Sequence, residues 1–528
     1  MKNLIALLSF VILLSSCRNA DNIYNIKRYG CTGNKSQITT SQIQKAIDEC
    51  AGKGGGTILF PPGNYTTGQL ELHSNITIIL EAGATLYASR NFQDYKNLVT
   101  NYLPDDKLKK PNEACLLRAD SVNKLTIKGM GTIDGQAEQT WEELKVVDDF
   151  IKWETENAKN SGAEMKRAYQ KDPKITLLYF TNCKNVLIED VTIKDSPNWT
   201  CNLNNCEIVN VHGIKLYSSL EKGVNADGID VDGCRNVCIS DCIIESGDDA
   251  ICLKTPVIKG KYISCENVVV TNCILTSTST ALKLGTSGEG DFKNILFSNC
   301  VIRNSNRGLS IVVRDGANVS DVVFSNITIE TNRKNFFWWG NGDAIWVVLL
   351  KRTPESRLGS IKNVVFQNII AHSQGTSKIE GFEGKPLENI KFDNIQFFMS
   401  YESSPDKRAT DIFYAHDVNG LQMNNCQAVW DTGKTEPKWN VPFHFKDISS
   451  LRLNYLSGKQ PFKKGSMILC EDVHDALITQ CLPQPGTDAF LNLHGNNSEV
   501  LVQNNFLHHA RIPYIFSNGA NPLMISGK

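Results

Sequence analysis

The sequence predicts an all-β solenoid, a parallel β-helix closed at its N-terminal end by a capping helix. Three observations predict it: a corner motif that recurs along the chain, short β-branched runs with period-two alternation around each copy, and almost no helical periodicity between them. One coil of this kind cannot bury its own apolar face, so successive coils must stack. A β-sandwich array is the competing architecture, although sandwiches lack a repeated corner.

The corner motif consists of an apolar residue, a polar residue, Asn and a small apolar residue. Its copies are Phe180–Cys183, Val270–Cys273, Phe297–Cys300, Phe324–Ile327, Phe366–Ile369 and Phe392–Ile395. Successive copies lie one coil apart, because the spacings from Cys242 to Cys273 and from Cys273 to Cys300 are 31 and 27 residues. Asn tolerates the left-handed backbone of a sharp corner, and stacked Asn amides can bond to one another. We therefore expect an asparagine ladder at this corner.

Cysteines recur at the same kind of position, directly after Asn or Asp. They are Cys183, Cys206, Cys242, Cys273, Cys300 and Cys426. This regular placement predicts one internal column of reduced thiols that act as small apolar residues, rather than a set of disulfides. No Cys-x-x-Cys pair occurs, so we expect no structural zinc site and no other metal or cofactor.

The first residues, 1–17, are predicted to be a lipoprotein signal peptide. Lys2 precedes an apolar run from Leu4 to Leu14, which is too short to span a bilayer and typical of a signal-peptide core. The four residues that end at Cys17 resemble a bacterial lipobox, which implies cleavage before Cys17 and lipid on its thiol. An ordinary signal peptide with a coincidental cysteine is the alternative. We expect an exported chain, lipid-anchored to a bacterial outer membrane on its periplasmic or cell-surface face.

Residues 18–56 are predicted to form an N-terminal segment with a helical cap, and residues 57–528 the β-helix. Ser41-Gln-Ile-Gln44 fits a capping box and Gly52 fits a C-terminal stop. The apolar face between them consists of Ile43, Ala46, Ile47 and Cys50. This helix is expected to cover the first coil.

A charged, helix-favouring insertion at about 138–172 interrupts the repeat and contains Trp141 and Trp153. Insertions in a solenoid emerge as loops, often on the binding face. A bulky insertion at one end of a substrate groove would admit only the end of a polymeric substrate, so we expect action from the end of that polymer (exo action). Packing of the insertion far from the acidic residues described below is the alternative.

Charge and composition restrict the partners. Lys and Arg number 55 and Asp and Glu 56, so the formal net charge is −1, which disfavours nucleic-acid binding. The hydrophobic fraction of 41% and the charged fraction of 21% argue against disorder. We expect a monomer.

Three aspartates carry the predicted chemistry. Asp227 and Asp248 are 21 residues apart, close to one coil, and Asp249 follows directly. Neighbouring strands lie about 4.8 Å apart, so these carboxylates should lie near each other on one outer face. Clustered carboxylates cannot all ionise without cost, so one should keep a raised pKa, and that split provides a general acid and a general base. Solvated turn residues are the alternative, which the one-coil spacing disfavours.

Several ordered motifs are similar to those of family 28 glycoside hydrolases, the polygalacturonase-like enzymes with a right-handed, pectin lyase-like β-helix. The motifs are Phe60-Pro-Pro-Gly-Asn-Tyr-Thr-Thr-Gly68, Leu80-Glu-Ala-Gly-Ala-Thr-Leu86, Ile127-Lys-Gly-Met-Gly-Thr-Ile-Asp-Gly135, Ser196-Pro-Asn-Trp199, Asn225-Ala-Asp-Gly-Ile-Asp230 and Ser246-Gly-Asp-Asp-Ala-Ile-Cys-Leu-Lys254. The resemblance runs from the N-terminal cap to about residue 330. It implies hydrolysis of pectic α-glycosidic bonds with inversion.

The resemblance also implies roles for single residues. Asp248 corresponds to the general acid, and Asp227 and Asp249 to the pair that activates water. Asn225 and Lys254 correspond to ligands of the sugar at the point of cleavage. Carboxylates one coil apart fit the short separation of retaining enzymes, whereas the resemblance implies inversion by three acids around one water.

Two expected motifs are absent. Thr280 stands where members that cut polygalacturonan carry the His of Gly-His-Gly, and Ser310 and Val312 stand for the Arg and Lys of Arg-Ile-Lys. Ser and Val cannot replace a bidentate Arg–carboxylate contact. We therefore expect polygalacturonan to be a poor substrate and a neutral sugar such as rhamnose to lie beyond the scissile bond.

Other residues are candidates for substrate contact. Lys283, Arg307 and Arg314 are alternative sources of positive charge, or solvated surface residues. Trp338 and Trp339 are candidates for stacking on sugar faces, although one of the two is expected to pack in the core.

The sequence thus favours a glycosidase acting on pectic polysaccharide, on rhamnogalacturonan or another pectic oligosaccharide. An α-galactosidase or rhamnosidase on the same fold is the first alternative, and a non-catalytic glycan-binding lipoprotein the second. A calcium-dependent lyase is a third, because an acidic cluster can bind calcium, although the basic proton abstractor that a lyase needs is missing.

Overall fold

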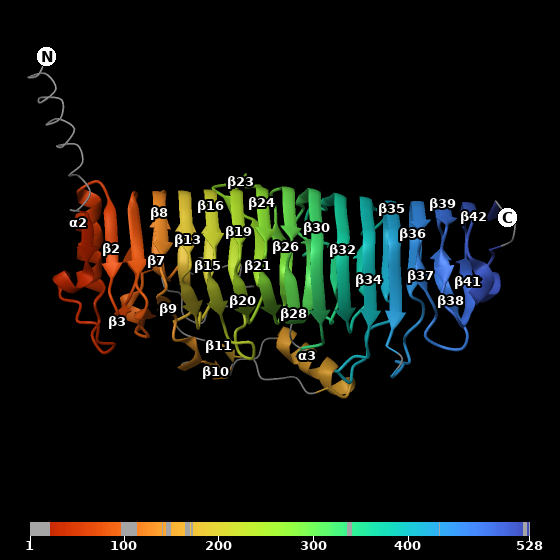
Figure 1. Cartoon of the computed structure of the whole chain (residues 1–528), viewed down its shortest axis with the longest axis horizontal. Coiled ribbons are helices and arrows are strands. Elements are labelled where there is room, and N and C mark those ends of the chain that lie inside the picture. Colours follow the sequence, from red (N-terminus) through yellow and green to blue (C-terminus); the bar gives the residue numbers. More distant parts are fainter. Residues whose placement is uncertain are drawn as a thin grey trace, which may run out of the picture.

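The computed structural model describes residues 22–96, 113–139, 141–143, 149–163, 169–170, 173–334, 340–431, 433–520 and 525–526. These residues form a right-handed parallel β-helix, in which the strands lie side by side along the long axis of the molecule (Figure 1). The N-terminal helix lies at one end and the C-terminus at the other. The predicted solenoid is confirmed, and the sandwich alternative is wrong, because the long ladders pair in parallel.

The strands of the solenoid form three parallel ladders. Sheet 1 contains β1 (Ile23–Asn25), β2 (Gly56–Phe60), β5 (Ile76–Leu80), β8 (Asn123–Lys128), β13 (Lys184–Glu189), β16 (Glu207–His212), β19 (Arg235–Ser240), β24 (Cys265–Thr271), β27 (Phe292–Ser298), β39 (His474–Thr479), β42 (Ser498–Gln503) and β44 (Ile525–Ser526). Sheet 2 contains β3 (Gly63–Thr67), β6 (Ala84–Ala88), β9 (Thr132–Asp134), β14 (Thr192–Lys194), β17 (Lys215–Tyr217), β20 (Ile243–Ser246), β25 (Ile274–Ser277), β28 (Val301–Ser305), β37 (Ser457–Gly458) and β40 (Leu482–Pro483). Sheet 3 contains β4 (Leu70–Glu71), β7 (Cys115–Asp120), β12 (Thr176–Thr181), β15 (Cys201–Asn204), β18 (Ile229–Asp232), β21 (Ile251–Thr255), β26 (Thr280–Gly288), β29 (Arg307–Val313), β31 (Ile345–Leu349), β33 (Ser377–Glu380), β38 (Ser466–Glu471), β41 (Thr487–His494) and β43 (Ala510–Ser517).

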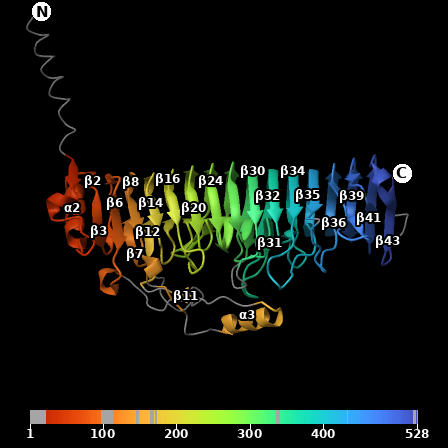
Figure 2. The same ribbon diagram turned by 60° about the horizontal axis from the view of Figure 1, so that its bottom comes forward.

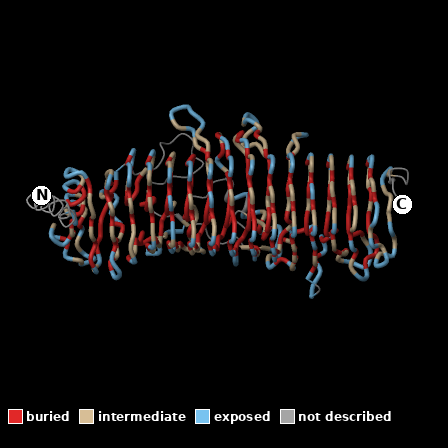
Figure 3. Tube along the Cα trace, turned by 45° about the horizontal axis from the view of Figure 1, so that its top comes forward, coloured by how far each residue is buried: buried red, intermediate tan, exposed pale blue. Residues whose placement is uncertain are grey.

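Five longer strands bend around a corner and belong to two or three sheets. They are β30 (Asn318–Thr331), β32 (Ser360–Ser373), β34 (Leu387–Met399), β35 (Phe413–Trp430) and β36 (Phe443–Asn454). The strand β1 already pairs with β2, so the ladder begins inside the segment that the sequence assigned to the cap. Buried and exposed positions alternate along the coils, as period-two patterning requires (Figure 3).

The interior is filled by columns of like residues, one from each coil. Phe297, Phe324, Phe366 and Phe392 stack with ring centroids 5.0, 5.0 and 4.8 Å apart in turn. All four rings are fully buried. Offset or stacked aromatic contacts of this kind add to the free energy of burial.

The predicted asparagine ladder is confirmed at the corner between sheets 1 and 2. Each amide donates to the amide oxygen one coil back, through Asn326, Asn368, Asn394 and Asn425, at distances between 2.9 and 3.1 Å. The φ angles at Asn326 and Asn394 are both 56°, in the left-handed region that Asn tolerates better than other L-residues with a Cβ. The ladder thus satisfies side-chain amides at a strained turn.

The thiols are buried and unpaired, as predicted, but they form two columns rather than one. Cys183 and Cys206 lie at the corner between sheets 3 and 1, whereas Cys242, Cys273 and Cys300 lie at the corner between sheets 1 and 2. Cys426 belongs to the second column. Both corners use the same residue pattern, because both need a left-handed residue followed by a small inward one, so the motif alone does not distinguish them.

The N-terminal cap is the helix α2 (Thr40–Gly52), preceded by the 3-10 turn η1 (Ile26–Tyr29). Its predicted apolar face of Ile43, Ala46, Ile47 and Cys50 is buried, and the helix ends at Gly52. The predicted capping box at Ser41 is wrong. The N-cap is Thr39, whose hydroxyl donates to the carbonyl oxygen of Thr66 at 3.0 Å and makes no cap hydrogen bond. The start of the helix is therefore fixed by its contact with the first coil and not by a side-chain cap.

The insertion contains the helix that its composition predicts. Its elements are η3 (Ala137–Gln139), the antiparallel pair β10 (Glu142–Glu143) and β11 (Tyr169–Gln170), and the helix α3 (Asp149–Asn160). In two views α3 lies beside the solenoid, on its lower side (Figures 1 and 2). Trp153 is exposed. The start of the insertion contacts the solenoid, since Glu138 lies 4.0 Å from the ammonium of Lys222, which also lies 5.5 Å from the ring of Tyr169.

The remaining short elements lie outside the ladders. They are η2 (Phe92–Asp94), η4 (Leu507–His509) and the antiparallel pair β22 (Val257–Ile258) and β23 (Lys261–Tyr262). Among the described residues, no helix is both long and apolar enough to cross a bilayer.

Asn326 provides a test of the ladder, because it both donates to Asn299 at 3.1 Å and accepts from Asn368 at 3.0 Å. Asn326→Ala should lower the free energy of unfolding by about 2 kcal/mol, through two lost hydrogen bonds and the left-handed φ. Asn326→Gly loses the same hydrogen bonds, but glycine adopts the left-handed φ without strain. Its free energy of unfolding should therefore be about 1 kcal/mol higher than that of Asn326→Ala. Urea unfolding of both variants measures the difference. Equal losses would show that the corner is not strained.

Candidate active site

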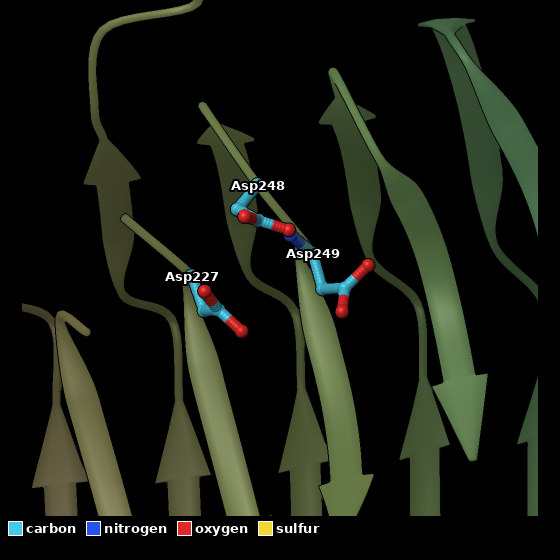
Figure 4. A group of neighbouring side chains, drawn as sticks. All are labelled: Asp227, Asp248 and Asp249. Atoms are coloured by element: carbon cyan, nitrogen blue, oxygen red, sulfur yellow. The ribbon is translucent and has the colours of Figure 1, made fainter. Parts of the chain in front are cut away.

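The three predicted acids lie together at the corner where the chain enters sheet 3 (Figure 4). Ile229 is in register with Ile251, so Asp227 stands directly one coil before Asp249, rather than before Asp248. One carboxylate oxygen from each of the three aspartates lies within 4.8 Å of the other two. All three side chains are buried. The turn that separates β20 from β21 therefore brings two adjacent residues to one point.

Asp248 is placed to hold a proton. Its carboxylate accepts the backbone N–H of Asn225 at 3.0 Å and that of Asp249 at 2.9 Å. Burial raises the pKa of Asp248 well above its usual range, and the neighbouring charges of Asp227 and Asp249 raise it further. Asp248 thus stays protonated at a pH where an ordinary aspartate is ionised.

Asp249 has the opposite environment. The ammonium of Lys283 lies 2.6 Å from one carboxylate oxygen, and the other accepts the hydroxyl of Ser279 at 2.8 Å and the N–H of Thr280 at 3.1 Å. Burial acts to raise the pKa of Asp249, but the charge and hydrogen bond of Lys283 and the Ser279 hydrogen bond outweigh it, and the pKa falls below its usual range. Asp249 is therefore the ionised member of the adjacent pair.

Asp227 shares the second ammonium group of the site. Lys254 lies 3.3 Å from its carboxylate, forms a closer ion pair with Asp230, and stands 5.0 Å from the centre of the Trp199 ring. Burial raises the pKa of Asp227, and Lys254 opposes that rise. Burial acts to lower the pKa of Lys254, but the carboxylates of Asp230 and Asp227 outweigh it, so Lys254 remains a cation.

This arrangement can supply and accept protons at one point. A protonated carboxyl and an ionised carboxylate lie side by side, in surroundings that separate their pKa values. Three carboxyl groups within 4.8 Å are also a donor set that divalent cations favour. Lys254 and Lys283, however, already supply positive charge to two of the three, so the residues here do not fit a resident metal ion.

The two remaining residues predicted around the acids are also at the site. The side-chain oxygen of Asn225 accepts a hydrogen bond from Lys174 at 3.1 Å. Thr280 is fully buried against Asp249, and its hydroxyl has no hydrogen-bond partner among the described residues.

The predicted arginines separate into one near and one distant residue. Arg307 is in register with Thr280, which places it two coils beyond Asp249 in the same column. It forms a close ion pair with Asp343, and its guanidinium lies 3.7 Å from the centre of the Trp346 ring.

Arg314 follows the other end of β29, seven positions after Arg307. At the rise of an extended chain this is roughly 23 Å along the strand, so the structure does not bring Arg314 to the acids. Trp338 and Trp339 lie outside the described residues.

Sequence reasoning missed Asp230, Trp199, Ser279 and Lys174 as parts of the site. Asp230 had a signal: it alternates with apolar residues in Ile229-Asp-Val-Asp232, so it points away from the core of a buried strand. The contacts of Lys174 and Ser279 join segments 51 and 30 residues apart, and no local pattern indicates them.

Comparison with known proteins places the chain in a family. Residues 50–413, more than half of the chain, match the family model described as glycosyl hydrolases family 28. The chain belongs to glycosyl hydrolases family 28. This membership confirms the resemblance and extends it beyond residue 330, to strands on the C-terminal side of the acids.

Curated relatives of this family 28 protein match over part of their length. They are a probable polygalacturonase of Vitis vinifera (26% identical, 43% of each chain), an exo-poly-alpha-D-galacturonosidase of Dickeya chrysanthemi (28%, 43% of this chain and 41% of the relative) and an endo-polygalacturonase of Pectobacterium carotovorum subsp. carotovorum (28%, 42% and 52%). The chain therefore spans about half the length of the curated relatives it matches.

Solved structures agree on the fold of the family 28 protein. A hyperthermoactive exopolygalacturonase from Thermotoga maritima superposes with a TM-score of 0.60 at 20% identity, over 79% of this chain and 93% of that one. The family 28 exopolygalacturonase of Yersinia enterocolitica gives 0.56 at 18% identity, over 82% and 78%. At these identities the likeness shows the β-helix alone.

Lys254 provides a test of the site's charge balance that does not depend on activity. Lys254→Met leaves the fully buried Asp230 without its cation and should lower the free energy of unfolding by about 3–5 kcal/mol at pH 7. In the variant the folded-state pKa of Asp230 lies above the unfolded value, so the folded state binds more protons and the loss should shrink as the pH falls toward 5. Urea unfolding at both pH values measures it.

The matched control is Lys391→Met, which removes an exposed pair with Asp393 at 3.2 Å in sheet 1. Exposed pairs contribute less than about 1 kcal/mol. A pH-independent loss in Lys254→Met, or one no larger than the control's, would contradict the assigned charge balance.

Proposed function

We propose that this family 28 protein is a glycosidase that cleaves α-glycosidic bonds of pectic polysaccharide by inverting acid/base catalysis. The observation that carries the proposal is the cluster of Asp227, Asp248 and Asp249 within 4.8 Å, in surroundings that raise the pKa of Asp248 and lower that of Asp249. Curated relatives named polygalacturonases support the pectic substrate class.

In the proposed mechanism Asp248 donates its proton to the leaving glycosidic oxygen as the bond to the anomeric carbon breaks. Asp227 and Asp249 hold one water between them and take its proton as its oxygen attacks the opposite face of the sugar. Lys283 keeps Asp249 ionised, and Asn225 and Lys254 hold the sugar at the point of cleavage. The short spacing of the acids resembles that of retaining enzymes, but two acids that share one water leave neither free as a nucleophile.

The substrate we propose has a neutral sugar beyond the scissile bond, as in rhamnogalacturonan-like chains. The cations nearest the acids already have carboxylate partners: Lys283 pairs with Asp249 and Arg307 with Asp343. One coil on from Lys283 lies Ser310, whose buried hydroxyl has no hydrogen-bond partner among the described residues. Such groups suit sugar hydroxyls better than a carboxylate.

Exo action is proposed from the position of the insertion. Glu138, at its start, contacts Lys222, which lies in the loop that leads from β17 to Asp227. We infer that the insertion at about 138–172 stands beside the acids and limits how many sugar units can bind on the N-terminal side of the cleavage point. A curated relative at 28% identity is named an exo-poly-alpha-D-galacturonosidase.

Export, lipid attachment at Cys17 and a monomeric state are proposed from the sequence. The predicted signal peptide and lipobox, 1–17, lie outside the described residues. We propose that the mature chain is held at a bacterial outer membrane by this lipid, with the catalytic domain on the periplasmic or cell-surface face.

The alternatives receive less support from the site. A glycan-binding protein does not need three buried aspartates within 4.8 Å of one another, whereas acid/base catalysis does. A calcium-dependent lyase needs the acids free for the ion, whereas Lys254 and Lys283 lie against two of them.

Asp248→Asn should reduce kcat by on the order of 100-fold or more, because the amide cannot protonate the leaving oxygen. In the unsubstituted protein kcat/KM should fall at high pH as Asp248 loses its proton and at low pH as Asp249 gains one. Steady-state rates across pH measure both limbs, with circular dichroism to check folding and the exposed Asp393→Asn as control. An Asp248→Asn variant that keeps most of its rate on an unactivated substrate would remove Asp248 from this role.

A panel of pectic oligosaccharides tests the substrate. Rhamnose-containing fragments should be cleaved with a higher kcat/KM than polygalacturonan, because Ser310 and Val312 cannot form ion pairs with a second carboxylate.

Proton NMR of the first product gives the anomeric configuration, and a time course gives the product sizes. Steady release of one small product with slow loss of viscosity agrees with exo action, whereas an early ladder of oligomers contradicts it. Faster cleavage of polygalacturonan would overturn the neutral-sugar assignment.

A further inference from the structure

A second hollow lies on sheet 3, on the C-terminal side of the acids. It is a cavity of about 420 Å³, within the size range of small-molecule sites, and its lining includes Asp343, Lys378, Asp411, Tyr414 and His444. None of these residues belongs to the acid cluster. The family match ends at residue 413, so Tyr414, Lys438, Asn440 and His444 of the lining lie beyond it.

The register of sheet 3 connects this cavity to the acids. The column that starts at Lys283 continues, one residue per coil, through Ser310, Trp346, Lys378, Tyr414 and His444. At about 4.8 Å per coil, Lys378 lies roughly 14 Å and His444 roughly 24 Å from the level of Lys283. The cavity and the acids therefore face the same side of the solenoid and lie along one line parallel to its axis.

The cavity contains cations that are not paired with the catalytic acids. Its lining includes Lys378, Arg408 and Lys438. Lys438 is exposed and donates to a neutral group, the carbonyl oxygen of Lys407, at 2.7 Å. Lys378 lies 2.9 Å from the partly exposed Glu380, on its own strand. Ammonium groups at this exposure remain available to a carboxylate ligand, since such pairs are weak in water.

An aromatic ring and an imidazole that lies between two carboxylates complete the lining. The Tyr414 ring packs edge-on against His444 at 4.9 Å between centroids. His444 is 12% exposed and lies 3.5 Å from Asp411 and 3.4 Å from Glu471. Neither ring nitrogen has a well-aligned hydrogen bond among the described residues. Both nitrogens instead face carboxylates, and these outweigh the effect of burial and raise the pKa of His444. His444 and Asp411 therefore form a charged wall of the cavity that can bind ligand hydroxyls.

We propose that this cavity is a remote sugar-binding site for a carboxylate-bearing unit of the same polysaccharide that is cleaved at the acids. The inference rests on the proposed function for the identity of the polysaccharide. Lys378 and Lys438 bind the carboxylate, Tyr414 packs against the sugar ring, and His444 with Asp411 binds hydroxyl groups.

The mixture of groups selects this ligand class. An apolar ligand would cover Asp411 and the ammonium groups of Lys378 and Lys438 without offering them a polar contact. A phosphate or a bare anion would use the cations but neither the Tyr414 ring nor the carboxylate of Asp411. A uronic acid uses all three kinds of group. A neutral subsite at Ser310 and a basic one several coils on together suit a chain that contains both neutral and acidic sugars.

Binding can be measured without turnover in the folded Asp248→Asn protein, by calorimetry with a galacturonate-containing pectic oligosaccharide long enough to reach from the acids to the cavity. Lys378→Ala with Lys438→Ala, and separately Tyr414→Ala, should each weaken Kd by about tenfold. The same oligosaccharide with its carboxyl groups reduced to alcohols should already bind weakly, and the lysine substitutions should weaken it by less than twofold more. Lys391→Ala is the matched control, because Lys391 also pairs with a carboxylate on its own strand, but in sheet 1.

Two results would overturn the inference. One is a Kd for the lysine variant equal to that of Lys391→Ala. The other is displacement of the oligosaccharide by inorganic phosphate with no effect of Tyr414→Ala, which would make the cavity a simple anion site. Failure of the proposed function is seen separately, as no cleavage of any pectic oligosaccharide by the unsubstituted protein, and it leaves the binding measurement intact.

Discussion

Parallel, in-register stacking of coils at about 4.8 Å is the constraint on which the rest of this structure depends. Every side chain meets the side chain at the same position one coil away. For apolar and amide side chains this repetition is favourable, as the phenylalanine column and the asparagine ladder show. For charged side chains it is costly, because it places like charges at close range unless a cation intervenes.

The acid cluster follows from this constraint. Stacking puts Asp227 directly beside Asp249, and the turn before β21 adds Asp248 to the pair. Lys254 and Lys283 project from adjacent strands and pair with the two stacked acids. Asp248 forms no ion pair with a cation in the described part of the chain, and burial with the charges of Asp227 and Asp249 raises its pKa. Whether an aspartate of this cluster serves as acid or base thus depends on whether a lysine on a neighbouring strand reaches its carboxylate. Rigid strands hold that difference in place more accurately than loops would.

Much of this could be predicted from the sequence, because repetition makes local signals cumulative. The corner asparagines, the apolar face of α2 and the three acids were all visible as patterns, and family membership confirmed the fold. The errors have a common cause. The capping box at Ser41 and the single thiol column were inferred from local patterns, whereas the structure decides them by docking and corner identity. The 21-residue spacing did bring Asp227 and Asp248 together, although the residue in direct register with Asp227 is Asp249.

Other features had no local signal at all. The ion pair of Arg307 with Asp343 joins residues 36 apart in sequence, and the lining of the second cavity comes from several coils. Arg314 was a candidate source of positive charge for the substrate, but it stands at the far end of β29 from Arg307.

The two thiol columns have a consequence for how the chain reaches its folded state. Cys242, Cys273 and Cys300 stand one coil apart, and about 4.8 Å is within the range of roughly 4.4–6.8 Å between Cα atoms that a disulfide spans. Once folded, Cys426 and Cys481 are protected, since burial raises the pKa of their thiols to about 12. Cys273 differs, because hydrogen bonds with the thiols of Cys242 and Cys300 lower its pKa to about 4. An unfolded chain has no such protection. In an oxidising compartment, coil closure therefore competes in time with thiol oxidation, and the coils that carry these columns must close faster than their sulfurs can be crosslinked.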